Sequence, residues 1–158
     1  MLTLYKFPLS PISIAAPLFL ENCQAGFPSP AQDYVERELD LNEYCVMRPA
    51  ATFFVRASGQ SMTDIGLNSG DLMVVDKAES PRHGDIVIAE IEGEFTVKRL
   101  LLRPRLTLQP MNPSFSPIYP DPETLQIFGV VIREIRRMRR DAMCQERSFR
   151  SATDTSSI

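Results

Sequence analysis

Short runs rich in β-branched and aromatic residues fill residues 51–138, and turn-forming residues separate them. The runs occupy residues 52–57, 72–76, 85–90, 93–100, 106–109 and 125–135. This composition favours strands, and the glycines and prolines between the runs favour turns. Because no helical pattern intervenes, the strands are expected to pair antiparallel, without the long crossovers that parallel strands need. The sequence therefore predicts a mainly β fold with a curled, mostly antiparallel sheet.

The segments on either side of the strand-rich region differ from it in composition. Residues 1–27 are rich in proline and follow neither the helical nor the strand period, so we expect a flexible N-terminal arm. Residues 28–140 are expected to form the folded domain. Residues 141–158 are polar and hold too little apolar surface to offset the entropy of ordering them, which predicts a disordered C-terminal tail.

A short helix is expected near the start of the folded domain. Ser29 suits an N-cap and Pro30 suits the first helical position. In such a helix Val35 and Leu39 would face inward.

Charge, cysteine content and hydropathy exclude several classes of protein. The net charge of −3 gives no overall attraction to nucleic acid, so the sequence does not favour direct DNA binding. Three cysteines without a CxxC pair indicate a reducing compartment and predict neither a metal site nor a cofactor. The apolar stretch at residues 9–20 is interrupted by prolines and is shorter than the ~20 residues of a membrane span. We therefore expect a cytoplasmic protein without a membrane partner.

Ser61 and Lys98 are the strongest candidates for catalytic residues. With His83 as its single histidine, the chain has little from which to build a histidine-based triad, whereas a buried lysine can also deprotonate a serine. Lys98 lies in an apolar strand run, where desolvation would favour the neutral amine. Ser61 follows Gly59, and the sharp turn expected there can offer backbone N–H groups to an oxyanion. On spacing alone, a turn serine and a solvated strand lysine remain the simpler interpretation.

The chain resembles the UmuD proteins, relatives of the LexA-type self-cleaving repressors, across most of its length. The resemblance is carried by ordered blocks at residues 26–31, 33–36, 40–42, 57–62, 70–72, 75–76, 83–89, 93–98, 110–112 and 128–132.

The resemblance implies a role for individual residues. Ser61 matches the family's nucleophile and Lys98 its general base, and the backbone N–H groups of Gln60 and Ser61 match its oxyanion hole. The family's cleavage site aligns with Ala25 and Gly26. Many UmuD-type sites have cysteine before the glycine, whereas this chain has alanine, as LexA-type repressors do.

The resemblance also implies partners. In this family a RecA filament on single-stranded DNA stimulates self-cleavage. The shortened product then acts as a homodimer with a UmuC-type translesion polymerase. The expected role is that of a bacterial SOS-response protein in error-prone synthesis past DNA lesions.

Three other classes share part of this pattern. Signal peptidases also use a Ser-Lys pair, but they normally carry a membrane anchor. A LexA-type transcriptional repressor needs a helix-turn-helix ahead of its catalytic half, and the residues before Ala25 are too few and too rich in proline to form one. A non-cleaving module that binds and regulates a polymerase remains the alternative from a different functional class.

Overall fold

The computed structural model describes residues 4–6, 13, 15–19 and 35–138. The strands of these residues are β1 (Leu4–Lys6), β2 (Ala15–Phe19), β3 (Val35–Asp40), β4 (Thr52–Arg56), β5 (Leu72–Asp76), β6 (Ile86–Ile91), β7 (Glu94–Leu101), β8 (Thr107–Gln109) and β9 (Gln126–Ile135). The helical elements are the α-helix α1 (Leu41–Cys45) and the 3-10 turns η1 (Pro49–Ala51) and η2 (Thr63–Ile65).

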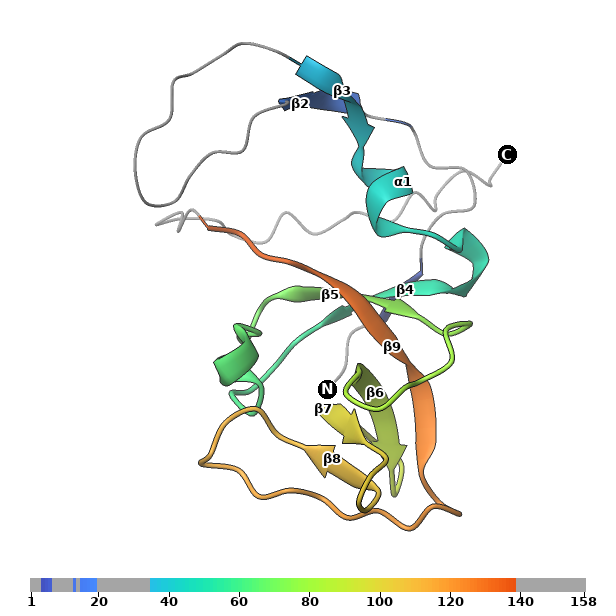
Figure 1. The fold of residues 1–158 in the computed structure, drawn as a ribbon, viewed down its shortest axis with the longest axis vertical. Helices are drawn as coiled ribbons and strands as arrows, with labels where there is room; N and C mark the ends of the chain where they lie inside the picture. Colours follow the sequence, from blue (N-terminus) through green and yellow to red (C-terminus); the bar gives the residue numbers. More distant parts are fainter. Residues whose placement is uncertain (1–3, 7–12, 14, 20–34, 139–158) are drawn as a thin grey trace, which may run out of the picture.

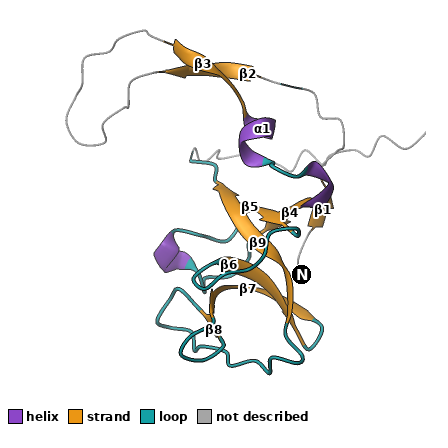
Figure 2. Cartoon of the chain, turned by 45° about the vertical axis from the view of Figure 1, so that its right-hand side comes forward, coloured by secondary structure: helices purple, strands orange, loops and turns teal. Residues whose placement is uncertain are grey.

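Most strands belong to one sheet of seven, in the order β1-β4-β5-β9-β6-β7-β8, and β2 pairs with β3 in a second, two-stranded sheet. Each of these strand pairs is antiparallel. Figures 1 and 2 show β9 crossing the body obliquely between β5 and β6, and the β2–β3 pair set apart beyond α1. The predicted mainly β, mostly antiparallel fold is confirmed.

β9 joins the two halves of the large sheet, because it pairs with β5 along one edge and with β6 along the other. The register shifts between Val74 and Val75 in the first pairing, and between Ile88 and Ala89 in the second. Irregularities of this kind bend a strand and increase its twist. The sheet therefore curls around β9 and does not lie flat.

The β6–β7 hairpin sets the register of Lys98. Its turn residues Glu92 and Gly93 have φ angles of 51° and 81°, and two successive positive φ values are typical of a tight type I′ turn. The turn pairs Ile91 with Glu94, and this register continues to Val87 opposite Lys98. Lys98 thus lies opposite a fully buried residue of β6.

Two clusters of buried apolar side chains form the core of the described region. The first contains Val55, Ala57, Met62, Leu67, Met73, Val75 and Ile88. The second contains Val87, Ala89, Leu100, Leu108 and Val130. Along β7, Val97 packs against the first cluster and Leu100 belongs to the second. Lys98 therefore lies between two apolar clusters.

An ion pair ties the segment after α1 to the end of β5. Asp76 is fully buried, and its Oδ2 accepts a hydrogen bond from Arg48 Nη1 at 2.6 Å. Asp76 Oδ1 accepts another from the backbone N–H of Ala78 at 2.7 Å. Glu79 Oε2 lies 3.0 Å from the same guanidinium nitrogen. The bond to Asp76 is the main cause that raises the pKa of Arg48.

The prediction of a helix around Val35 and Leu39 is wrong. Both residues lie in β3, which pairs with β2, and α1 begins only at Leu41. Asp40 is the N-cap, because its side chain accepts a hydrogen bond from the N–H of Asn42 at 2.8 Å. The partner strand β2 decides the conformation, and local sequence did not reveal it.

Strands β1 and β2 lie within the predicted N-terminal arm, where no strand was expected. The predicted boundary near residue 28, the predicted start of the helix at Ser29 and the tail at 141–158 lie outside the described residues. The division into arm, domain and tail therefore stays a prediction.

Candidate active site

Ser61 lies on the turn that leads from β4 to η2. Beyond β4 the chain stays paired, since the N–H of Ala57 donates to Asp71 O at 2.8 Å and the N–H of Gly70 to Ala57 O at 2.9 Å. Gly59 then turns the chain sharply with a φ of 86°, a conformation that glycine adopts without strain. The next side chain after Ser61, that of Met62, is 2% exposed and anchors the turn in the core. Ser61 is itself half-buried.

Lys98 reaches Ser61 from β7. Its Nζ lies 3.0 Å from Ser61 Oγ, 2.8 Å from Thr96 Oγ1 and 3.0 Å from Val97 O. The residue is 8% exposed, and no carboxylate of the described part of the chain forms an ion pair with it. Burial without a counter-charge disfavours the ammonium, so desolvation lowers the pKa of Lys98 below its ordinary value of 10.5.

The three neighbours of Lys98 Nζ suit both of its protonation states. An ammonium has three N–H donors, which match the three oxygen atoms. A neutral amine has two N–H groups and one lone pair. Val97 O and Thr96 Oγ1 can accept the two N–H groups, and the lone pair can accept the hydroxyl proton of Ser61. A proton can therefore pass between Ser61 and Lys98 without a rearrangement of the site.

A loop between β8 and β9 supports the serine turn from the other side. The N–H of Met111 donates to Ser61 O at 2.7 Å, and the N–H of Asp64 donates to Met111 O at 2.8 Å. The side chain of Asn112 donates from Nδ2 to Gln60 O at 2.8 Å.

An open groove of about 460 Å³ begins beside the lysine. It is lined by Ile91, Glu92, Glu94, Phe95, Thr96 and Ile118. Thr96 is shared between this groove and the contacts of Lys98. The groove thus reaches one residue that contacts Lys98, whereas Ser61 itself lines a separate small pocket of about 10 Å³, together with Gly59, Met62 and Val97 among others.

A comparison of the sequence with profiles of protein families identifies the family of this chain. The profile of the Peptidase S24-like family matches residues 17–132, which is more than half of the chain. The chain belongs to the Peptidase S24-like family. The match includes part of β2, all of β3 to β8, most of β9, and the turn that bears Ser61.

Individual S24-like relatives agree with the expected UmuD resemblance. Protein SamA of Salmonella typhimurium is 63% identical over 139 residues, which cover 88% of this chain and 98% of SamA. Protein ImpA of Escherichia coli is 61% identical over 144 residues, with 88% and 98% covered. Protein MucA of Escherichia coli is 53% identical over 122 residues, with 75% and 83% covered. These are UmuD-family proteins, so the predicted membership of the UmuD family is confirmed.

The S24-like fold brings some of the predicted site residues together. Ser61 and Lys98 are in contact, and Gln60 lies on the same turn as Ser61. The predicted cleavage site at Ala25 and Gly26 lies outside the described residues. Within the described ranges, no three His, Cys, Asp or Glu side chains are grouped so that they could hold a metal ion. No helix among the same residues is long and apolar enough to cross a membrane.

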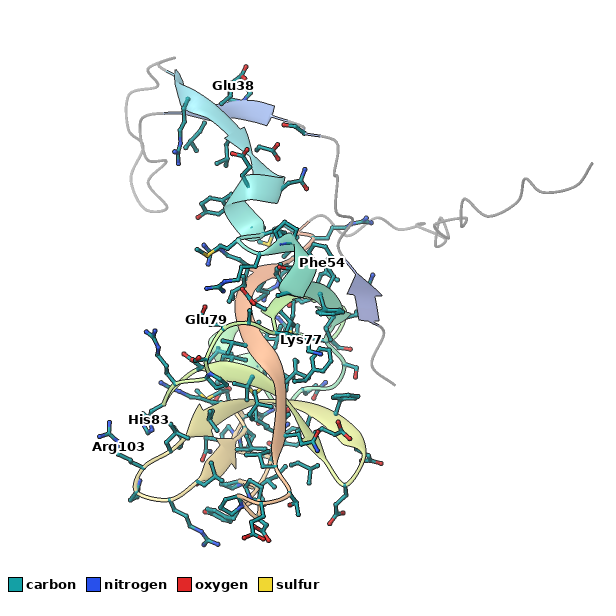
Figure 3. The ribbon with its side chains drawn as sticks, turned by 90° about the vertical axis from the view of Figure 1, so that its right-hand side faces the viewer. Glu38, Phe54, Lys77, Glu79, His83 and Arg103 are labelled. Atoms are coloured by element: carbon teal, nitrogen blue, oxygen red, sulfur yellow. The ribbon has the colours of Figure 1, made fainter. Side chains whose placement is uncertain are left out.

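Sequence reasoning missed three residues that contact the site. Thr96 accepts from Lys98, while Met111 and Asn112 hold the serine turn. The block 110–112 contributed to the UmuD resemblance, but nothing in its local pattern indicated where it would pack. His83, for which no catalytic role was expected, accepts a hydrogen bond from the N–H of Leu102 at 3.0 Å, and Figure 3 shows it beside Arg103.

Proposed function

We propose that this chain is a UmuD-like SOS mutagenesis protein that cleaves its own peptide bond between Ala25 and Gly26. Ser61 is the nucleophile and Lys98 the general base. The observation that carries the proposal is the 3.0 Å contact between Ser61 Oγ and the Nζ of a lysine that is 8% exposed. A serine needs a neighbouring base, and only a desolvated lysine offers a neutral amine near neutral pH.

The reaction proceeds through an acyl-enzyme. Ser61 Oγ attacks the carbonyl carbon of Ala25 while its proton passes to Lys98 Nζ, and the carbonyl oxygen becomes an oxyanion. The N–H groups of Gln60 and Ser61 stabilise this oxyanion, a contribution of ~3–4 kcal/mol for a single donor. When the C–N bond breaks, Lys98 returns the proton to the nitrogen of Gly26. Water, deprotonated in turn by Lys98, then hydrolyses the ester that links Ala25 to Ser61.

Membership of the UmuD family supports the cellular role that we propose. A RecA filament on single-stranded DNA stimulates cleavage by favouring the arrangement in which the arm occupies the groove. The shortened homodimer then serves as a subunit of a UmuC-type error-prone translesion polymerase in the bacterial cytoplasm. The similarity to SamA, ImpA and MucA over most of their lengths supports this role.

The test is the intact mass of the purified protein after incubation with RecA, single-stranded DNA and a nucleotide. The wild type is expected to yield a fragment that begins at Gly26. Ser61→Ala, which removes one hydroxyl, is expected to stay whole and serves as the matched control.

Two results would contradict the proposal. A Ser61→Ala variant that is still cut would assign the cleavage to another nucleophile. A wild type that stays whole, both at raised pH and while a LexA-type repressor is cut in the same tube, would favour the non-cleaving module that regulates a polymerase.

A further inference from the structure

We propose that Asn112 is a positioning residue for the oxyanion hole. Its side-chain amide orients and polarises the peptide group between Gln60 and Ser61, whose N–H is one of the two oxyanion donors. This inference rests on the proposed self-cleavage and adds a residue that acts through the backbone, from a loop distant in sequence.

Asn112 contacts the peptide group whose N–H is one of the proposed oxyanion donors. Asn112 Nδ2 donates to Gln60 O at 2.8 Å, and Thr63 Oγ1 donates to the same oxygen at 3.2 Å. Gln60 C=O and Ser61 N–H belong to one planar trans peptide group, so they point in opposite directions. Donors that hold the carbonyl on one side therefore fix the direction of the N–H on the other. They also polarise the peptide group, which makes its N–H a stronger donor.

The orientation of the Asn112 amide is itself fixed. Asn112 Oδ1 accepts a hydrogen bond from the backbone N–H of Ser114 at 2.9 Å. The oxygen end of the amide is thereby assigned to Ser114, so the NH₂ end must face Gln60 O. Exchange of the two ends would set two acceptors against each other and two donors against each other.

The same loop also fixes the next peptide group. The N–H of Met111 donates to Ser61 O at 2.7 Å, which restrains the peptide between Ser61 and Met62. The peptide groups on both sides of Ser61 are thus held from the loop between β8 and β9, whereas Lys98 approaches from β7. Within the described residues, Lys98 Nζ donates to Ser61, Thr96 and Val97 and not to Asn112, so the effect of Asn112 should reach the oxyanion and leave the titration of Lys98 unchanged.

The test compares Asn112→Ala and Asn112→Asp with the same changes at Asn68. Asn68 is a matched control, because its Nδ2 also donates to a backbone carbonyl of this region, that of Gly66, at 2.6 Å. That peptide group does not include Ser61. The self-cleavage rate is measured by intact mass from neutral to alkaline pH, together with the midpoint of thermal unfolding.

We expect Asn112→Ala to slow cleavage about tenfold at every pH, the usual effect of one lost hydrogen bond. Asn112→Asp should slow it at least as much, because an oxygen then faces Gln60 O. The pH of half-maximal rate should stay at the wild-type value, and the Asn68 variants should cleave at the wild-type rate.

Three results would overturn the inference while leaving the proposed function intact, provided that the wild type cleaves. One is a wild-type rate in both Asn112 variants. Another is a shift in the pH of half-maximal rate, which would mean that the site as a whole has loosened around Lys98. The third is loss of the folded state in both Asn112 variants, which would make the role structural. A wild type that does not cleave would instead refute the proposed function.

Discussion

At the scale of the residue, the buried amine of Lys98 decides when the proposed chemistry can occur. Desolvation lowers its pKa below 10.5. The protonated form, present below that pKa, cannot accept the proton of Ser61, and the neutral form above it can. We therefore expect the self-cleavage rate to rise with pH and to reach half of its maximum below pH 10.5, as measured by the intact mass of the protein over time.

A matched variant tests whether Lys98 is the titrating group. Lys98→Arg keeps a long cationic side chain, but a guanidinium stays protonated throughout this range and cannot serve as a base. It should remain uncut at every pH at which the protein is folded. A wild-type rate that did not change with pH, or a variant that kept the wild-type profile, would mean that another group titrates.

At the scale of the element, β5 approaches β9 closely at Gly129, a position without a side chain. A Cβ on Gly129 would lie 2.7 Å from Val75 Cγ1 and 2.9 Å from Asp76 O. Neither the backbone of Asp76 nor the buried side chain of Val75 can move away easily. Gly129→Ala should therefore lower the free energy of unfolding by ~1–3 kcal/mol, as measured in a urea titration. Gly93→Asn is the control, because nothing lies within 4 Å of an added Cβ there and asparagine tolerates positive φ. Equal stability losses in the two variants would contradict this steric account.

The strands show what sequence could and could not predict. The run at 72–76 was predicted with the bounds that β5 has, because its pattern is local. β1, β2 and β3 were missed, since each is stabilised by a partner distant in sequence, as Leu4 is by Val55. The contact of Ser61 with Lys98 was expected mainly from the UmuD resemblance. Asn112 was not assigned a role, because its partner Gln60 lies 52 residues away and no local pattern connects them.

At the scale of the whole molecule, the predicted cleavage site lies between two strands that pair with each other. Residues 20–34 connect β2 to β3, and β2 pairs with β3 from Ala15↔Asp40 onward. β1, still earlier in the chain, pairs with β4 in the large sheet. A cut between Ala25 and Gly26 would thus break the covalent chain and leave both strand pairs in place. Cleavage and departure of the N-terminal fragment are therefore separate steps.

We accordingly expect fragment 1–25 to remain bound after cleavage. A fully cut sample, with two masses under denaturing conditions, should elute as one species in native size-exclusion chromatography, as uncut Ser61→Ala does. Short strand pairs are only marginally stable on their own, so mild urea that leaves the large sheet folded should release the fragment. A fragment that elutes separately as soon as it forms would contradict this expectation. If the fragment is retained, cleavage at Ser61 alone does not expose the edge of β4 to a partner. That edge becomes accessible only when the strand pairs are lost.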